Sequence, residues 1–237
     1  MKIKVIFTML LIAALSTNLK AKERRYVTGG LGGELTSDRK FNLNTQLLAG
    51  GVNLPGSTSI TPTLNSKGTA IVPALAYGYE FGNFSTEINY SYAKNEFKYT
   101  NDDSTTTNKV NTHNIMLKGY YKFLPKEKIN PYVGAGVGLV MGEDELKAAV
   151  ASGTQAGSTI DFGSKSLANF GAMLIAGAQY NLSNKFALAV EYNFGYLDAS
   201  TKYDLITPVS SGVDLMVNAK LKSYLSHTLG VKVKYYI

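Results

Sequence analysis

The end of the chain alternates strictly between two kinds of side chain. From Leu221 to Ile237, odd positions are mostly leucine, valine, tyrosine and isoleucine, whereas even positions are mostly lysine, glycine, serine and threonine. Successive side chains of a strand point to opposite faces, so this period of two predicts a strand with one apolar face. The backbone groups of such a terminal strand need partners, and closure of a sheet into a barrel supplies them.

Seven earlier segments show the same alternation. They are residues 26–35, 69–81, 84–94, 113–123, 131–141, 170–182 and 186–196. The core of each segment has about 9–11 residues, the length that a tilted strand needs to cross a membrane. Together with the terminal segment they predict an all-β protein, an eight-stranded antiparallel up-and-down transmembrane β-barrel.

The connections between these segments alternate in length. Residues 82–83, 124–130 and 183–185 form short connections, and residues 36–68, 95–112, 142–169 and 197–220 form long polar ones. Short turns at one end and long loops at the other are typical of outer-membrane barrels. We therefore expect four extracellular loops, with the short turns and both termini in the periplasm. Aromatic residues near the short turns predict a girdle at the periplasmic interface.

The composition of the two faces predicts which one meets lipid. The apolar face carries one charge, Lys94 at the end of a segment, where it can reach the headgroups. A lysine or arginine facing the middle of the bilayer would cost about 2–4 kcal/mol, so this exclusion favours lipid contact over a soluble barrel with an apolar interior. Pro73 fits a strand poorly, and we expect it near the outer rim, at a bulge.

The opposite face combines small residues with charges of both signs. The predicted polar network of the lumen is Glu34, Glu87, Lys118, Lys122, Glu191, Lys232 and Lys234. It could line an ion-conducting channel or form paired ions that fill the barrel. An eight-stranded barrel is just wide enough for its own side chains, which favours the filled interior. We then expect removal of Glu87 alone to destabilise the protein.

The N-terminal segment has the features of a secretory signal peptide. Lys2 and Lys4 precede a largely apolar run over residues 5–15, which is too short to span a bilayer as a helix. We assign residues 1–21 to the signal, with cleavage after Ala21 or Ser16, and residues 22–237 to the barrel domain. The chain has no cysteine, which excludes disulfides and cysteine metal sites. The formal charge of +7 falls to +4 without Lys2, Lys4 and Lys20 of the signal, and this modest, scattered excess argues against nucleic-acid binding.

Candidate catalytic and cofactor residues are few. Gly134, Gly136 and Gly138 share one face, whereas a dinucleotide fingerprint needs a different spacing and a following helix, so small residues of the lumen are the better interpretation. His227 and Ser226 point to opposite faces of the strand. Ser223 and His227 share a face but lie too far apart for a hydrogen bond. We expect no catalytic site, no metal site at His113 or His227, and no cofactor.

Four segments resemble the small outer-membrane β-barrels that include opacity-type adhesins, attachment–invasion barrels and rickettsial-type surface antigens. These are residues 130–138 (NPYVGAGVG), 180–183 (YNLS), 189–194 (AVEYNF) and 229–237 (LGVKVKYYI). The last resembles the terminal assembly signal of that family. Its outward residues are Leu229, Val231, Val233, Tyr235 and Ile237. The usual final residue is phenylalanine, and isoleucine keeps the face apolar.

The resemblance implies a surface protein of the bacterial outer membrane, an adhesin, surface antigen or envelope-structural protein acting through its long loops. A small porin is the alternative, and a lipid-modifying hydrolase is a weaker one. Expected partners are outer-membrane lipid, the barrel-assembly machinery and a host or matrix ligand. Val213, Leu215, Val217 and Ala219 extend the alternation of the last strand backward. They indicate either a protruding ribbon that binds a partner by strand addition or a mobile loop.

Overall fold

The computed structural model describes residues 23–37, 39–49, 52–53, 58–60, 63–64, 69–100, 104–150, 159–210 and 213–237. The predicted signal peptide lies outside these residues. In this part of the chain, no helix is long and apolar enough to span a membrane.

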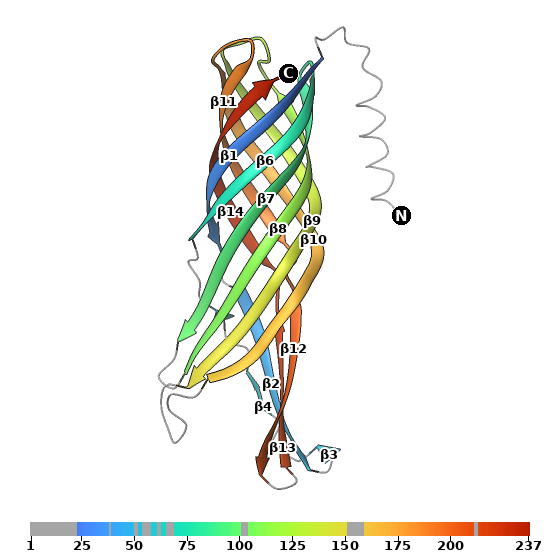
Figure 1. Cartoon of the computed structure of the whole chain (residues 1–237), viewed down its shortest axis with the longest axis vertical. Helices are drawn as coiled ribbons and strands as arrows, with labels where there is room; N and C mark the ends of the chain where they lie inside the picture. Colours follow the sequence, from blue (N-terminus) through green and yellow to red (C-terminus); the bar gives the residue numbers. More distant parts are fainter. Residues whose placement is uncertain are drawn as a thin grey trace.

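Eight of the described strands form a closed barrel (Figure 1). Around the barrel they follow the order β1, β14, β11, β10, β9, β8, β7 and β6. Their bounds are β1 (Arg24–Thr36), β6 (Thr69–Phe81), β7 (Phe84–Thr100), β8 (Ser104–Lys122), β9 (Ile129–Val150), β10 (Thr159–Asn181), β11 (Phe186–Leu197) and β14 (Tyr224–Tyr236). All neighbours are antiparallel, and the first and last strands pair from Tyr26 with Tyr236 to Thr36 with Ser226. The predicted antiparallel up-and-down barrel is confirmed.

Aromatic side chains surround the short turns at one end of the barrel, the end predicted to face the periplasm. Gly82 adopts a φ of 63° in the tight turn between β6 and β7, a conformation that favours glycine. The ring of Phe84 stacks on Phe81 at 6.0 Å and meets Tyr121 edge-on at 5.2 Å. Phe186 and Tyr235 form a similar contact, 5.0 Å between centroids, at the β11–β14 pair. The predicted girdle is therefore present at this end.

The prediction of a bulge at Pro73 is wrong. Pro73 pairs in regular register with Leu31 of β1. On its other side, β6 pairs with β7 only from Ala74 onward. Proline cannot donate a ladder hydrogen bond, and it stands where β6 has already separated from one neighbour, near the outer rim as expected.

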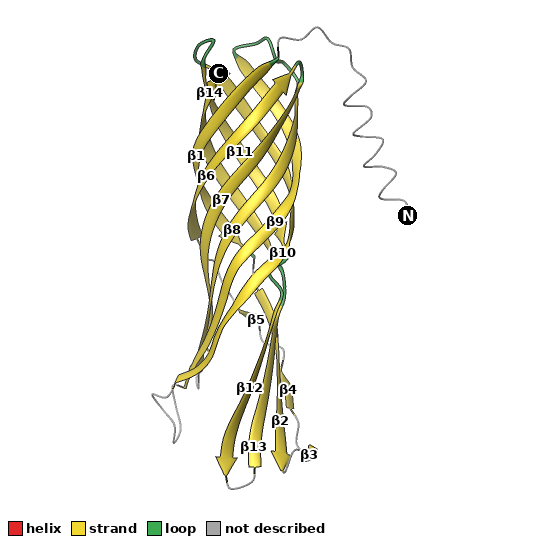
Figure 2. Cartoon of the chain, turned by 45° about the vertical axis from the view of Figure 1, so that its right-hand side comes forward, coloured by secondary structure: helices red, strands yellow, loops and turns green. Residues whose placement is uncertain are grey.

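The prediction of four long loops is largely wrong, because strands occupy most of those residues. Strands β7 to β10 continue well past the predicted ends of their segments (Figure 2). The predicted first and last loops contain β2 (Arg39–Ala49), β3 (Val52–Asn53), β4 (Thr58–Ile60), β5 (Thr63–Leu64), β12 (Thr201–Ser210) and β13 (Val213–Leu221). The longer strands keep their two-residue period, but the polarity of their two faces is exchanged.

Strand β7 shows this exchange clearly. In its first part, Ile88 and Tyr90 are exposed on the outside while Glu87 and Asn89 are buried inside. In its second part, Lys94 and Lys98 are exposed outside while Phe97 is fully buried. Strands β8 and β9 change in the same way, with Lys109 and Glu143 exposed outside and Val110 and Leu146 buried inside. Exposed lysine and glutamate side chains are compatible with water but not with lipid, so the exchange indicates a surface at which lipid gives way to water around the barrel.

An apolar core fills the barrel beyond this surface. It is formed by Phe97, Val110, Val140, Leu146, Leu167, Leu197, Ala199, Tyr203, Ala219, Leu221 and Tyr224. We call these residues the outer core. They come from β7 to β11, from β12 to β14 and from the connection after β11, so the chain that leaves the barrel folds back over its mouth.

Strands β12, β13 and β2 form a sheet that projects past the barrel (Figures 1 and 2). The alternation over residues 213–219 predicts a strand, and β13 confirms it. Lys222 and Ser223 separate β13 from β14, so the two are not one continuous strand. Strand β13 pairs with β12 on one side and with β2 on the other. Strand β13 therefore has no free edge of its own, and the partner binding expected of a protruding ribbon stays a prediction.

Candidate functional site

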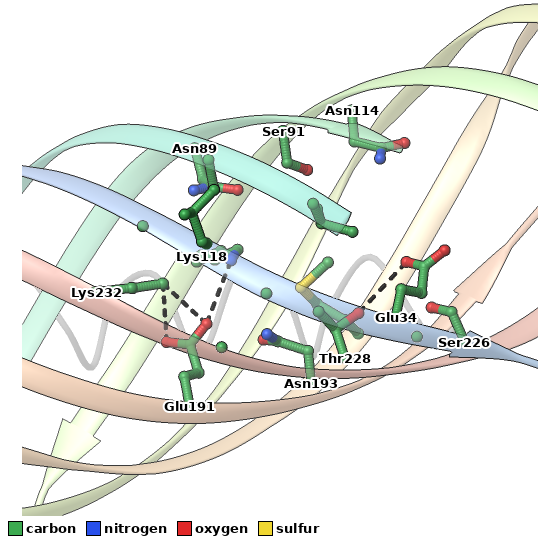
Figure 3. Close-up of a pocket in the computed structure, with 18 of the residues that line it drawn as sticks. Glu34, Asn89, Ser91, Asn114, Lys118, Glu191, Asn193, Ser226, Thr228 and Lys232 are labelled. Carbon is green, nitrogen blue, oxygen red and sulfur yellow. Dashed lines mark hydrogen bonds and ion pairs between the residues drawn. The ribbon is translucent and has the colours of Figure 1, made fainter. Parts of the chain in front are cut away.

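The middle of the lumen holds four of the predicted network residues as a compact group of ions. We call Glu87, Lys118, Glu191 and Lys232 the ion quartet. Lys232 Nζ lies 3.2 Å from Glu87 Oε1 and 2.8 Å from Glu191 Oε1. Lys118 Nζ lies 3.6 Å from Glu191 Oε1 and 4.0 Å from Glu87 Oε1 (Figure 3 shows the bridges to Glu191). Two cations and two anions balance, which is how a barrel interior can hold charges out of water.

Two further network lysines meet a carboxylate that sequence reasoning missed. Lys122 forms a buried ion pair with Glu80, and Lys234 Nζ lies 4.0 Å from the same carboxylate. Arg24 adds a third cation at 2.9 Å. Glu80 shares strand and parity with Gly78, so the period-two pattern of residues 69–81 contained the signal that would have identified it.

Tyrosines complete the lumen. The hydroxyl of Tyr120 donates to Glu87 at 2.6 Å, that of Tyr132 to Glu191 at 3.2 Å, and that of Tyr236 to Glu80 at 3.0 Å. These three tyrosines face inward, a role that the sequence analysis did not predict. Each ring fills space beside an ion. Each hydroxyl donates a hydrogen bond to a carboxylate oxygen and so replaces the water that this oxygen loses on burial.

Glu34 does not join the ions. Its carboxylate accepts hydrogen bonds from Asn95 Nδ2 at 2.8 Å and from Thr228 Oγ1 at 3.3 Å. The residue is only 5 % exposed, and within the described ranges no cationic side chain forms an ion pair with it. The structure thus brings six of the seven predicted network residues into ion pairs and leaves Glu34 apart, nearer the outer end.

A second buried ionic site closes the barrel mouth. Arg39 of β2 is fully buried and reaches Asp144 of β9, with 2.8 Å between Nη2 and Oδ2. It also donates to Asn108 Oδ1 at 2.5 Å and to the carbonyl oxygens of Ala199 and Lys222. One side chain therefore joins the projecting sheet to two barrel strands and to the segments before β12 and after β13. Arg39 and Asp144 both lie in segments that the sequence analysis assigned to loops, and for this reason the pair was not predicted.

The hydroxyl of Tyr203 reinforces this closure. It donates to the backbone carbonyl of Asp144, beside the hydrogen bond from Thr201 to the Asp144 carboxylate. Burial raises the pKa of Tyr203 above its ordinary value, and the negative charge of Asp144 adds to the shift. Tyr203 therefore remains a neutral donor within the outer core.

Two small cavities remain in the lumen. The larger, about 70 Å³, lies between the ion quartet and Glu34, and the smaller, about 20 Å³, lies below the quartet beside Lys122 and Lys234. Glu191 and Lys232 of the quartet line both cavities, and Leu197 of the outer core lines the larger one. This arrangement resembles a filled cylinder rather than a channel.

The two histidines and the two candidate serines have different partners and do not form a common site. His113 and His227 are on the outward face, with Nδ1 2.7 Å and 2.6 Å from the hydroxyls of Tyr90 and Tyr192. Ser223 donates to Asp198 at 2.8 Å, and Ser226 faces the lumen. In the part of the chain with described coordinates, no three His, Cys, Asp or Glu residues gather as metal ligands.

The residues of the predicted assembly signal share the lipid-facing side of β14. Leu229, Val231, Val233, Tyr235 and Ile237 are all exposed there. This placement agrees with the expected parity. Recognition of these residues by an assembly machinery stays a prediction.

Several solved structures resemble the fold at low sequence identity. Neisserial surface protein A is 16% identical, with 89% of this chain and 96% of that chain covered and a TM-score of 0.46. OprG from Pseudomonas aeruginosa is 12% identical, with 91% and 97% covered and a TM-score of 0.44. Ail from Yersinia pestis is 12% identical, with 89% and 99% covered and a TM-score of 0.31.

No curated protein matches the sequence. A protein-family model, in contrast, matches nearly the whole chain. Residues 6–236 match the outer membrane protein beta-barrel domain. The protein is therefore a member of the outer membrane β-barrel family and is located in the bacterial outer membrane.

Proposed function

We propose that this protein is a surface protein that binds a partner through its projecting extracellular sheet, and that it is not a diffusion pore. The observation that carries the proposal is the filled barrel. The ion quartet occupies the middle of the lumen, and the Arg39–Asp144 pair and the outer core occupy its mouth. A solute would have to displace both.

The projecting sheet supports the binding role. Strand β12 pairs with β13 and, among the described strands, with no other. Its other edge therefore presents backbone groups to which an extended segment of a partner could add as a strand. Lys202, Asp204 and Ile206 are exposed along it, with Ile206 59 % exposed. Pro208, further along β12, has no backbone N–H to donate. The part of the edge that could accept a partner strand therefore lies before Pro208.

Planar-bilayer recording tests the filled lumen. We expect the purified, folded protein to give no steady conductance, because paired ions leave no continuous water path. An Arg39→Ala, Phe97→Ala double variant serves as the comparison, since it opens the mouth but leaves the ion quartet. Steady conductance from the unaltered protein would favour a small porin and overturn the proposal.

Deletion of residues 205–217 tests the sheet. Cells that carry the deletion should lose attachment to host cells or matrix, while the barrel still shows its heat-dependent shift in detergent gels. Deletion of residues 151–158, between β9 and β10, is the matched control and should keep attachment. Equal attachment by the two deletions would dismiss a binding role of the sheet.

A hydrolase remains a weaker candidate, and no observation here favours it. The placement of Ser223, Ser226 and His227 leaves these three residues without a shared site. Lipid hydrolysis that disappears in the His227→Ala variant would establish an enzyme despite this placement.

A further inference from the structure

The cavity above the ion quartet is unequal in charge at its two ends. At one end, the two lysines of the quartet are balanced by two glutamates. At the other end lies Glu34, buried and without an ion pair among the described side chains (Figure 3). Burial of a carboxylate is costly even with the hydrogen bonds from Asn95 and Thr228, and a cation or a proton at Glu34 would reduce that cost.

Unpartnered oxygens in the same region favour a cation. Asn95, Asn114 and Asn193 each have a buried side-chain oxygen without a hydrogen-bond donor among the described residues. Asn114 is only 6 % exposed, and Asn114 and Asn193 line the cavity together with Glu34, Ser226 and Thr228. A proton on Glu34 would form a hydrogen bond to one of these oxygens and leave the other oxygens without a partner. A cation uses several oxygens at once.

The space is of suitable size. The cavity of about 70 Å³ holds roughly five water molecules at 10–15 Å³ each, enough for an ion that keeps part of its water shell. Glycines preserve this space. A Cβ at Gly32 would lie 2.8 Å from Thr228 Cγ2, and one at Gly195 would lie 2.7 Å from Ser226 Oγ. Side chains at these positions would displace two residues of the wall.

We propose that the lumen binds one monovalent alkali-metal cation, of the sodium class, between Glu34 and the amide oxygens of Asn114 and Asn193. A single positive charge neutralises the single carboxylate, and the remaining ligands are neutral oxygens of amides, hydroxyls and water. A divalent cation would retain an uncompensated charge there, since the ions of the quartet already balance one another. We assign the site a structural role, because its proposed ligands are side chains of the barrel wall.

Thermal unfolding of the full barrel, refolded into detergent, tests the proposal. Choline chloride replaces sodium chloride at constant ionic strength, because choline is too large for the cavity. We expect sodium to raise the unfolding midpoint of the unaltered protein by roughly 3 °C or more. The unfolding midpoint of the Glu34→Gln variant should be the same in sodium chloride and in choline chloride. Glu143→Gln, which removes an exposed carboxylate on β9, should respond to sodium like the unaltered protein.

Three results would overturn the site. They are an unaltered protein that ignores sodium, a Glu34→Gln variant that responds equally, and a response to magnesium or calcium but not to sodium. A midpoint that falls with rising pH in both salts would instead assign a proton to Glu34. If Glu34→Gln does not fold, Asn114→Leu and Asn193→Leu keep the carboxylate and should still weaken the response to sodium. An undiminished response in both would also contradict the proposal.

Discussion

The lipid-facing and outer parts of strands β7 to β10 belong to the same continuous ladders, yet they place opposite kinds of side chain on the same face. Toward lipid the barrel shows Ile88 and Leu117, and around its lumen it holds ions. Beyond the membrane surface it shows Lys98 and Lys109 to water and encloses Phe97. Backbone geometry is common to both parts, so the surrounding solvent determines which residues each face carries.

The two parts also differ in what their buried ions do. The ion quartet lies in a narrow lumen with tyrosine hydroxyls and cavities around it. Arg39 and Asp144 lie inside an apolar core, and both side chains are completely buried. The second pair joins separate segments of chain, whereas the first fills space between strands that the barrel already holds together.

The largest effect should come from breaking the pair in the outer core. Asp144→Ala leaves the Arg39 guanidinium buried without a counter-ion, and we expect a loss of about 3–5 kcal/mol in the free energy of unfolding. Urea titration of the barrel refolded into lipid vesicles measures it. An Arg39→Met, Asp144→Leu double variant removes both charges and should lose far less. A double variant as unstable as Asp144→Ala would show that the charges themselves hold the mouth closed.

A lysine scan along one outward face should locate the boundary between the two parts. Val137 and Ala149 lie on the same face of β9, and both are exposed. Val137→Lys places a charge in the middle of the lipid-facing stretch and should cost about 2–4 kcal/mol. Ala149→Lys places the same charge in water, opposite Thr105 and Thr159, and should cost nothing measurable.

Vesicle refolding followed by urea titration compares the two variants directly. Equal stabilities would mean that the exchange of polarity does not mark the membrane surface.

The barrel could be predicted from the sequence because its signal is repeated in every strand. The bounds of residues 69–81 agree with β6, and the outward residues from Leu229 to Ile237 lie on one face of β14. Each apolar position there has one requirement, contact with lipid, so alternation alone identifies it.

The outer part could not be predicted in this way, because there the polar residues lie on the outward face and the apolar residues lie on the inward face. Beyond Lys94, where the predicted strand ends, the charged outward positions Glu96 and Lys98 indicate a polar loop when apolar residues are expected outside. The partners of Arg39 lie 69 and 105 residues away along the chain, and no local pattern connects them. Similarly, the isolation of Glu34 follows from which strands face it across the lumen.

The smallest effect concerns the outward histidines, which lie where the two parts meet. His227 pairs with Tyr192 on the β11–β14 ladder, and His113 pairs with Tyr90 on the β7–β8 ladder. Two strands separate these ladders on either side of the barrel, so the pairs are diametrically opposed. Tyr192→Phe removes one neutral hydrogen bond and keeps the ring, and we expect a loss of about 0.5–1.5 kcal/mol.

Matched substitutions decide whether the two histidine–tyrosine pairs are equivalent. Tyr90→Phe should cost the same as Tyr192→Phe, since in each pair an aromatic ring also lies against the histidine, Tyr92 in one and Phe194 in the other. Tyr196→Phe is the control, because this outward tyrosine has no hydrogen-bond partner among the described residues, and it should leave the urea midpoint unchanged. A loss at Tyr196 as large as that at Tyr192 would assign the effect to contact of the hydroxyl with lipid headgroups. The boundary between the two parts would then be held by lipid rather than by histidine.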